Sequence, residues 1–104
     1  MKKGKTSPRR LAPVHPGEVL REDFVKPLQL SMNRLALELR VPLTRVADIL
    51  HERRSITADT AMRLGRYFDT SARFWLNLQA AYDLDLAEEK LGPVIAREVR
   101  QRTA

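Results

Sequence analysis

The stretch Ser31–Leu50, SMNRLALELRVPLTRVADIL, decides the fold class. Ser31 can cap a helix, because its hydroxyl accepts a hydrogen bond from a free backbone amide. Pro42 disfavours helix before it and is well placed to start a second helix. The apolar residues that recur at helical spacing are Leu35, Ala36, Leu39, Val41, Val46 and Ile49. The pattern predicts two short helices joined by a tight turn, which is typical of a helix-turn-helix unit.

In such a unit the second helix enters the major groove of DNA. Its outward surface here holds Thr44, Arg45 and Asp48 on one helix face. Arginine can hydrogen-bond guanine, threonine can contact a thymine methyl, and aspartate can accept from cytosine. From the pattern alone, an αα-hairpin inside a helical bundle with no role in DNA binding remains an equal alternative.

Phosphate contacts are expected at two places beside this surface. Free amides around Ser31 and Asn33, and again at Leu43 and Thr44, lie at helix starts that favour phosphate oxygens. Two further basic residues, Arg53 and Arg54, follow the second helix, where a loop would run along the DNA backbone. The plainer interpretation of these arginines is that they are solvated surface charges.

Three more helices are expected around this unit. A first helix over about 16–26 has Pro16 in its first turn, and Thr57 caps another that carries Ala61 and Leu64. Ser71 caps a fifth over 72–84, which Gly92-Pro93 should separate from the final residues. That fifth segment is apolar nearly all round, so we expect one side to face the core and another to face a partner subunit. The expected core and dimer contacts are Phe74, Trp75, Leu78 and Tyr82.

Length and composition agree with one small helical domain. The chain has 104 residues, 4 glycines and no cysteine, which excludes disulfides, a cysteine nucleophile and a thiolate zinc site. No stretch is apolar enough for a membrane span or signal peptide, so a cytoplasmic location is expected. The net charge of +6 comes mainly from a basic leader over 1–14, and is therefore weak evidence that the folded part binds DNA.

Catalysis and metal binding are not expected. His51-Glu52 resembles the start of a zinc-protease motif, but Ser55 stands where that motif needs its second histidine. Acidic residues over 83–89 have no histidine or glycine-rich loop beside them, which favours a solvated helix face. Nothing assembles a nucleophile, a base and an electrophile, so no enzyme, metal or cofactor is predicted.

Three longer motifs resemble a known family. They are HPGEVLREDFVKPLQLSMNRLALELRVPLTRVADIL over 15–50, ITADTAMRLGRYF over 56–68 and TSARFWLNLQAAYDL over 70–84. Together they resemble the HigA antitoxin family, also called the VapI-like group, within the Xre/Cro class of helix-turn-helix proteins. The resemblance covers about residues 15–84.

The resemblance implies an all-α, five-helix Cro/C1-type domain that forms a homodimer through its C-terminal part. It also implies repression of the protein's own operon and neutralisation of a HigB-like toxin, a RelE-like ribonuclease that cleaves messenger RNA. By position, the base-reading surface falls on Leu43, Thr44, Arg45, Ala47 and Asp48. The phosphate-contacting positions fall on Ser31, Asn33, Arg53 and Arg54.

The sequence departs from the family pattern at four places. Arg40 occupies the turn position that is normally glycine, so a non-glycine residue is expected to adopt a left-handed conformation there. Glycine is also usual at the positions of Glu52 and Ser55. Ala47 stands where asparagine is common, which removes an expected adenine contact and leaves the operator sequence open.

The sequence thus predicts a helix-turn-helix domain over 15–91 with a dimerising fifth helix, followed by a tail or short helix over 92–104. The expected partners are double-stranded operator DNA, a HigB-like toxin and a second copy of the chain. Two alternatives remain: a transcriptional repressor without a toxin, and a module that acts mainly in protein interaction.

Overall fold

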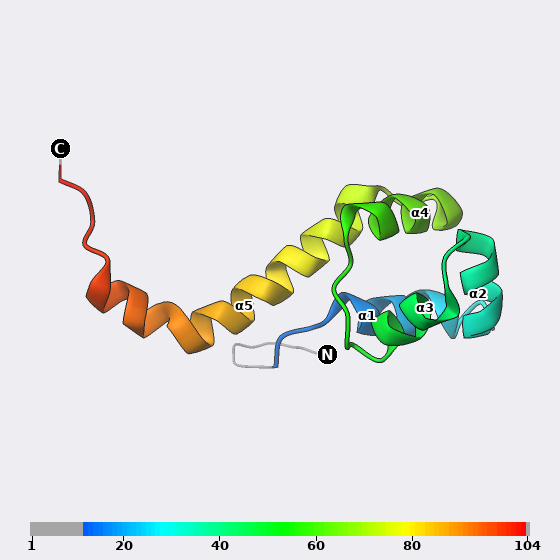
Figure 1. The fold of residues 1–104 in the computed structure, drawn as a ribbon, viewed down its shortest axis with the longest axis horizontal. Coiled ribbons are helices and arrows are strands. Elements are labelled where there is room, and N and C mark those ends of the chain that lie inside the picture. The colour runs from blue at the N-terminus through cyan, green and yellow to red at the C-terminus, as the bar shows by residue number, and fades with distance from the viewer. Residues whose placement is uncertain (1–11, 104) are drawn as a thin grey trace.

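The computed structural model describes residues 12–103, and every regular element in that range is a helix (Figure 1). The segments α1 and η1 form one continuous helix, which confirms the predicted five-helix, all-α architecture. In chain order the elements are α1 (Pro16–Val19), η1 (Leu20–Val25), α2 (Met32–Leu39), α3 (Leu43–Leu50), α4 (Ala58–Phe68) and α5 (Ala72–Glu98).

The predicted caps are confirmed. Ser31, Thr57 and Ser71 each accept a hydrogen bond from the backbone amide three residues later, at the starts of α2, α4 and α5. His15 also caps a helix, α1, because its Nδ1 accepts a 2.8 Å hydrogen bond from the amide of Gly17, two residues later. These side chains accept hydrogen bonds from amides that a helix start leaves without a backbone partner. The capping residues therefore define where the four helices begin.

The second part of the first helix has an unusual backbone. Residues Leu20–Val25 form a π-helix, in which backbone hydrogen bonds span five residues. Leu20 and Val25 are therefore both buried, whereas Leu28, which follows this helix, is exposed.

The core lies between the first helix, the α2–α3 pair, α4 and the first half of α5. Leu35, Leu64 and Trp75 have no exposed surface. Helix α1 also approaches α3 very closely, since a Cβ atom at Gly17 would lie 1.9 Å from the Ile49 carbonyl oxygen. Only glycine permits this approach, which fixes the second helix of the helix-turn-helix unit against the first helix of the chain.

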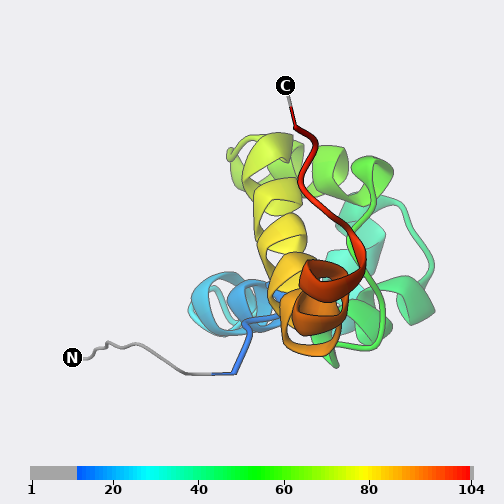
Figure 2. The same cartoon turned by 90° about the vertical axis from the view of Figure 1, so that its left-hand side faces the viewer.

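Helix α5 is longer than the sequence indicated. The expected helix end at Gly92-Pro93 is wrong, because α5 continues through Pro93 to Glu98 over 27 residues. Figures 1 and 2 show that its second half leaves the other helices and changes direction before the C-terminus. A proline inside a helix removes one hydrogen bond and crowds the preceding turn, and such sites commonly bend.

The expected dimer contacts lie on the side of α5 that packs against its own chain. Trp75 is fully buried within one chain and Tyr82 packs edge-on against His15, with ring centroids 4.8 Å apart. The prediction that Trp75 meets a partner subunit is therefore wrong, since the core of its own chain covers it. Phe74 is 38% exposed, while Leu78 is half-buried against the core.

The predicted basic leader falls almost wholly on residues 1–11, outside the described part of the chain. Within residues 12–103, no helix is long and apolar enough to cross a membrane.

Candidate nucleic-acid interface

The turn between α2 and α3 is held by an unusual backbone and by a distant arginine. Arg40 has φ 60° and ψ 46°, which confirms the expected left-handed conformation at this non-glycine position. Arg63 of α4 reaches the same turn and donates a 2.9 Å hydrogen bond from Nη1 to the Leu39 carbonyl oxygen. This contact satisfies a carbonyl at the end of α2 and links the turn to α4.

Helix α3 divides sharply into a buried side and an accessible side. Val46, Ile49 and Leu50 are buried in the core. Leu43 and Thr44 are exposed at the start of the helix. The other predicted base-reading residues, which are all half-buried, are Arg45, Ala47 and Asp48. The structure thus brings the five predicted positions to the first turns of one short helix.

Arg45 is bound to Asp59, the acidic residue in the first turn of α4. Its Nη1 lies 2.7 Å from Asp59 Oδ2, and Arg63 Nε lies 3.1 Å from the same oxygen. Hydrogen bonds from Arg63, and then from Arg45, hold the pKa of the Asp59 carboxyl below its usual value. This carboxylate is therefore negatively charged at neutral pH and joins two arginines from different helices.

Asp48 draws both predicted phosphate-binding arginines toward α3. Arg53 Nη2 lies 3.1 Å from Asp48 Oδ1, and Arg54 Nη2 lies 3.3 Å from Asp48 Oδ2. Both arginines remain largely exposed, and exposed ion pairs of this kind are weak and sensitive to salt. A phosphate can therefore replace the carboxylate as their partner at small cost.

The remaining predicted phosphate contacts lie at the start of α2. Asn33 is exposed there. The Ser31 hydroxyl oxygen already accepts a 2.9 Å hydrogen bond from the Arg34 amide, so it serves the helix cap.

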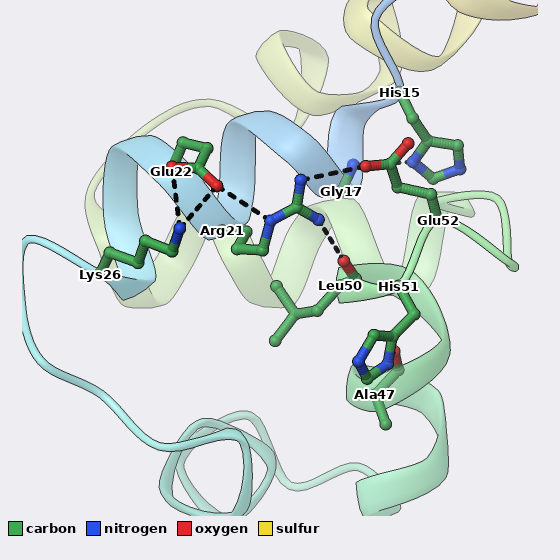
Figure 3. Close-up of polar contacts among 9 residues, drawn as sticks. All are labelled: His15, Gly17, Arg21, Glu22, Lys26, Ala47, Leu50, His51 and Glu52. Carbon is green, nitrogen blue, oxygen red and sulfur yellow. Dashed lines mark hydrogen bonds and ion pairs between the residues drawn. The ribbon is translucent and has the colours of Figure 1, made fainter.

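The far end of α3 is fastened to the first helix by Arg21 (Figure 3). Its Nη1 donates to the Leu50 carbonyl oxygen, and its Nη2 lies 3.1 Å from Glu52 Oε2. Glu52 has φ 63°, a left-handed conformation that glycine adopts most readily. The ion pair with Arg21 of η1 holds the Glu52 side chain directly after the end of α3.

Gln79 of α5 holds the loop over residues 51–57, which carries Arg53 and Arg54. The Gln79 side chain is 6% exposed and its Oε1 accepts a 2.8 Å hydrogen bond from the Ile56 amide. Its Nε2 donates to Ser55 Oγ at 3.3 Å and to Asp83 Oδ1 at 2.9 Å. A buried amide that makes all three contacts fixes the loop against α5.

The sequence pattern did not reveal the supporting roles of Arg21, Asp59, Arg63 and Gln79. Asp59 carried a recognisable signal only as an acidic residue near a helix start. The other three depend on contacts between residues more than twenty positions apart, which helical spacing cannot predict.

Comparison with known proteins gives clear relatives, although no protein-family model matches the chain. The chain is 54% identical over 76 residues to virulence-associated protein I of Dichelobacter nodosus, covering 73% of this chain and 70% of that protein. Its fold resembles antitoxin HigA of Pseudomonas aeruginosa, solved with the higBA promoter, with a TM-score of 0.85 and 47% identity over 88% of this chain and 99% of the other. It also resembles antitoxin GraA in complex with its operator, with a TM-score of 0.86 and 42% identity over 95% and 100% of the two chains. None of these names denotes an enzyme.

Proposed function

Because the chain belongs to the HigA family of helix-turn-helix antitoxins, we propose that it represses its own operon by binding operator DNA and neutralises a partner toxin. The observation that carries the DNA-binding part is the accessible start of α3, in a helix-turn-helix unit whose opposite side is buried. Two structural neighbours of similar sequence were solved with promoter or operator DNA, which supports the same activity here.

In this proposal, Arg45 is the principal base-reading residue. Its guanidinium can donate to guanine O6 and N7, while Thr44 and Leu43 are exposed beside it for contact with a thymine methyl or a neighbouring base edge. Ala47 allows close approach, and Asp48 can accept from cytosine once Arg53 and Arg54 turn to phosphates.

Phosphate contacts would fix the protein on the duplex. Arg53 and Arg54 project from the loop that Gln79 holds, and the amides at the start of α2 lie beside Ser31 and Asn33. Contacts of this kind add affinity that falls with salt and carry little sequence information.

We further propose that the protein binds as a homodimer whose recognition helices reach successive turns of the major groove, roughly 34 Å apart. The outward face of α5 supports this arrangement. Leu84, Leu91 and Ile95 of α5, and Val99 directly after it, are each at least half exposed. Single exposed apolar residues are ordinary, but several along one projecting helix favour burial against a second copy.

The dimer proposal is tested by Ile95→Glu in the full chain. Sedimentation velocity should show monomers with an unchanged helical circular dichroism spectrum, because the residue lies beyond the core of the domain. Lys90→Glu on the same helix is the control for added negative charge and should remain dimeric. An intact Ile95→Glu dimer would contradict this interface.

The expected toxin partner is a HigB-like, RelE-type ribonuclease. A small basic reading frame beside this gene, whose product copurifies with the chain and loses its mRNA cleavage, would support the antitoxin role. Absence of any such frame would favour a repressor that acts without a toxin.

DNase footprinting of the region upstream of the gene tests the operator proposal. The expected result is one protected region with two symmetric halves, centred about 10 base pairs apart. Protection without symmetry or position preference would contradict specific binding and favour a module that acts through protein contacts.

A further inference from the structure

We propose that Asp59 is a positioning residue that orients Arg45 for base reading and thereby contributes to operator specificity. The inference rests on the proposed DNA-binding function, and it adds a residue of α4 that itself need not touch DNA.

The geometry links Arg45 to the rigid part of the domain through two successive contacts. Arg45 Nη1 and Arg63 Nε both bind the same carboxylate oxygen of Asp59, at 2.7 and 3.1 Å. Arg63 in turn donates to the Leu39 carbonyl oxygen in the turn of the helix-turn-helix unit. The side chain of Arg45 is thus connected, through α4, to the backbone that sets the position of α3.

The position of Asp59 also favours its charged form. It lies in the first turn of α4, where the helix dipole stabilises a negative charge. Thr57 caps this helix and Thr60 is buried beneath it, so the backbone that carries Asp59 is well fixed. A carboxylate on a fixed backbone can hold a guanidinium in one direction, although both side chains touch solvent.

Orientation matters for arginine because its long side chain loses much conformational freedom when it becomes ordered. A contact that restricts the conformations of the arginine side chain before binding reduces the entropy that is lost when the side chain binds a base. A guanidinium carries five N–H donors, so one bond to Asp59 leaves donors for guanine. Asp59 can therefore keep its contact while Arg45 reads the base.

A role in orienting Arg45 differs from two simpler roles. If Asp59 only adds negative charge near the duplex, its neutralisation should strengthen binding to every sequence alike. If Asp59 holds Arg45 away from the duplex, its neutralisation should strengthen operator binding in particular.

The test measures the ratio of affinities for the DNA upstream of this gene and for a scrambled duplex of equal length. The variants of the full chain are Asp59→Asn, Arg45→Ala and the double variant. We expect Asp59→Asn to lower the ratio by about tenfold, within the range that one well-formed arginine–guanine contact supplies. In the Arg45→Ala background the same change should leave the ratio unaltered, because the side chain to be oriented is gone.

Two controls separate orientation from charge and folding. Glu38→Gln removes a carboxylate that pairs with Arg34 on α2 and does not contact Arg45, so the ratio should stay constant. Asp59→Glu keeps the charge and should restore part of the ratio. Thermal unfolding of each variant identifies any loss that comes from a damaged fold.

Several outcomes overturn the proposal. An unchanged or higher ratio for Asp59→Asn contradicts it, as does an equal loss with and without Arg45. If the unaltered protein does not prefer the upstream DNA, the proposed function itself fails. If the unaltered protein prefers the upstream DNA and Asp59→Asn leaves that ratio unchanged, only the positioning role is contradicted.

Discussion

Gln79 Oε1 accepts a 2.8 Å hydrogen bond from the Ile56 amide, which joins α5 to the loop after α3. The two residues are 23 positions apart in the chain, and both are buried. The contact therefore fixes the loop that carries Arg53 and Arg54 against α5. The same helix continues toward the proposed dimer partner.

Gln79→Leu should lower the free energy of unfolding by about 1–3 kcal/mol, because the buried Ile56 amide loses its acceptor. Urea denaturation followed by circular dichroism measures this change. Asn77→Ala, at an exposed position on the same helix, should change stability by less than about 0.5 kcal/mol. Equal stability of the Gln79→Leu variant and the unaltered protein would show that the amide finds another partner.

Gly17→Ala should destabilise the fold by about 1–3 kcal/mol or more, because the new methyl group would overlap the Ile49 carbonyl oxygen and push α1 from α3. Gly92→Ala is the matched control, since a Cβ there meets nothing within 4 Å. Its stability should be equal or slightly higher. Thermal unfolding of both variants distinguishes the two sites, and similar melting temperatures would contradict the close approach of α1 and α3.

Stability should fall on mild acidification because of His15. Burial lowers the pKa of His15 below 6.5, against smaller opposing effects from Glu52 and Asp83. The unfolded chain therefore binds the proton more readily than the folded chain. The His15 contribution is complete above about pH 6.5 and is lost as pH falls from there toward the lowered pKa.

His15→Asn should retain the cap on α1 and remove this part of the pH dependence, because asparagine offers an oxygen acceptor and does not titrate. Urea denaturation of both proteins at pH 5.5 and 7.5 measures the difference. If the two proteins lose stability equally on acidification, another group is responsible.

Arg45→Ala should weaken operator binding by about 1–3 kcal/mol and leave binding to scrambled DNA nearly unchanged. Arg53→Ala should weaken binding to both duplexes to a similar extent and reduce the slope of affinity against salt, as expected for a phosphate contact. Equal losses on both duplexes for Arg45→Ala would assign that residue to phosphate contact as well.

Local signals were sufficient to predict much of the fold. Ser31, Thr57 and Ser71 each mark a helix start through one hydroxyl, and the left-handed backbone at Arg40 was expected from its place in the turn. Such features depend on residues within a few positions of one another, so the sequence contains them directly.

The extent of α5 and the roles of its aromatic residues could not be predicted in this way. Gly92-Pro93 resembles a helix stop, yet α5 continues through it to Glu98. Several neighbours of Trp75 are also apolar, so the sequence does not distinguish it from them. Trp75 is buried in the core of its own chain because the first helix and α4 pack against α5. The Arg45–Asp59 pair likewise depends on tertiary packing, because α4 packs against α2 and places Asp59 beside Arg45 of α3.

Sequence-specific binding through α3 is tested most directly by a fluorescence-anisotropy titration of the full chain. The DNA immediately upstream of the gene is compared with a scrambled duplex of equal length, at low and near-physiological salt. We predict a strong preference for the upstream DNA that persists at the higher salt and is lost in Arg45→Ala. Equal binding to both duplexes that disappears with salt would contradict specific recognition and leave only generic contacts to phosphate.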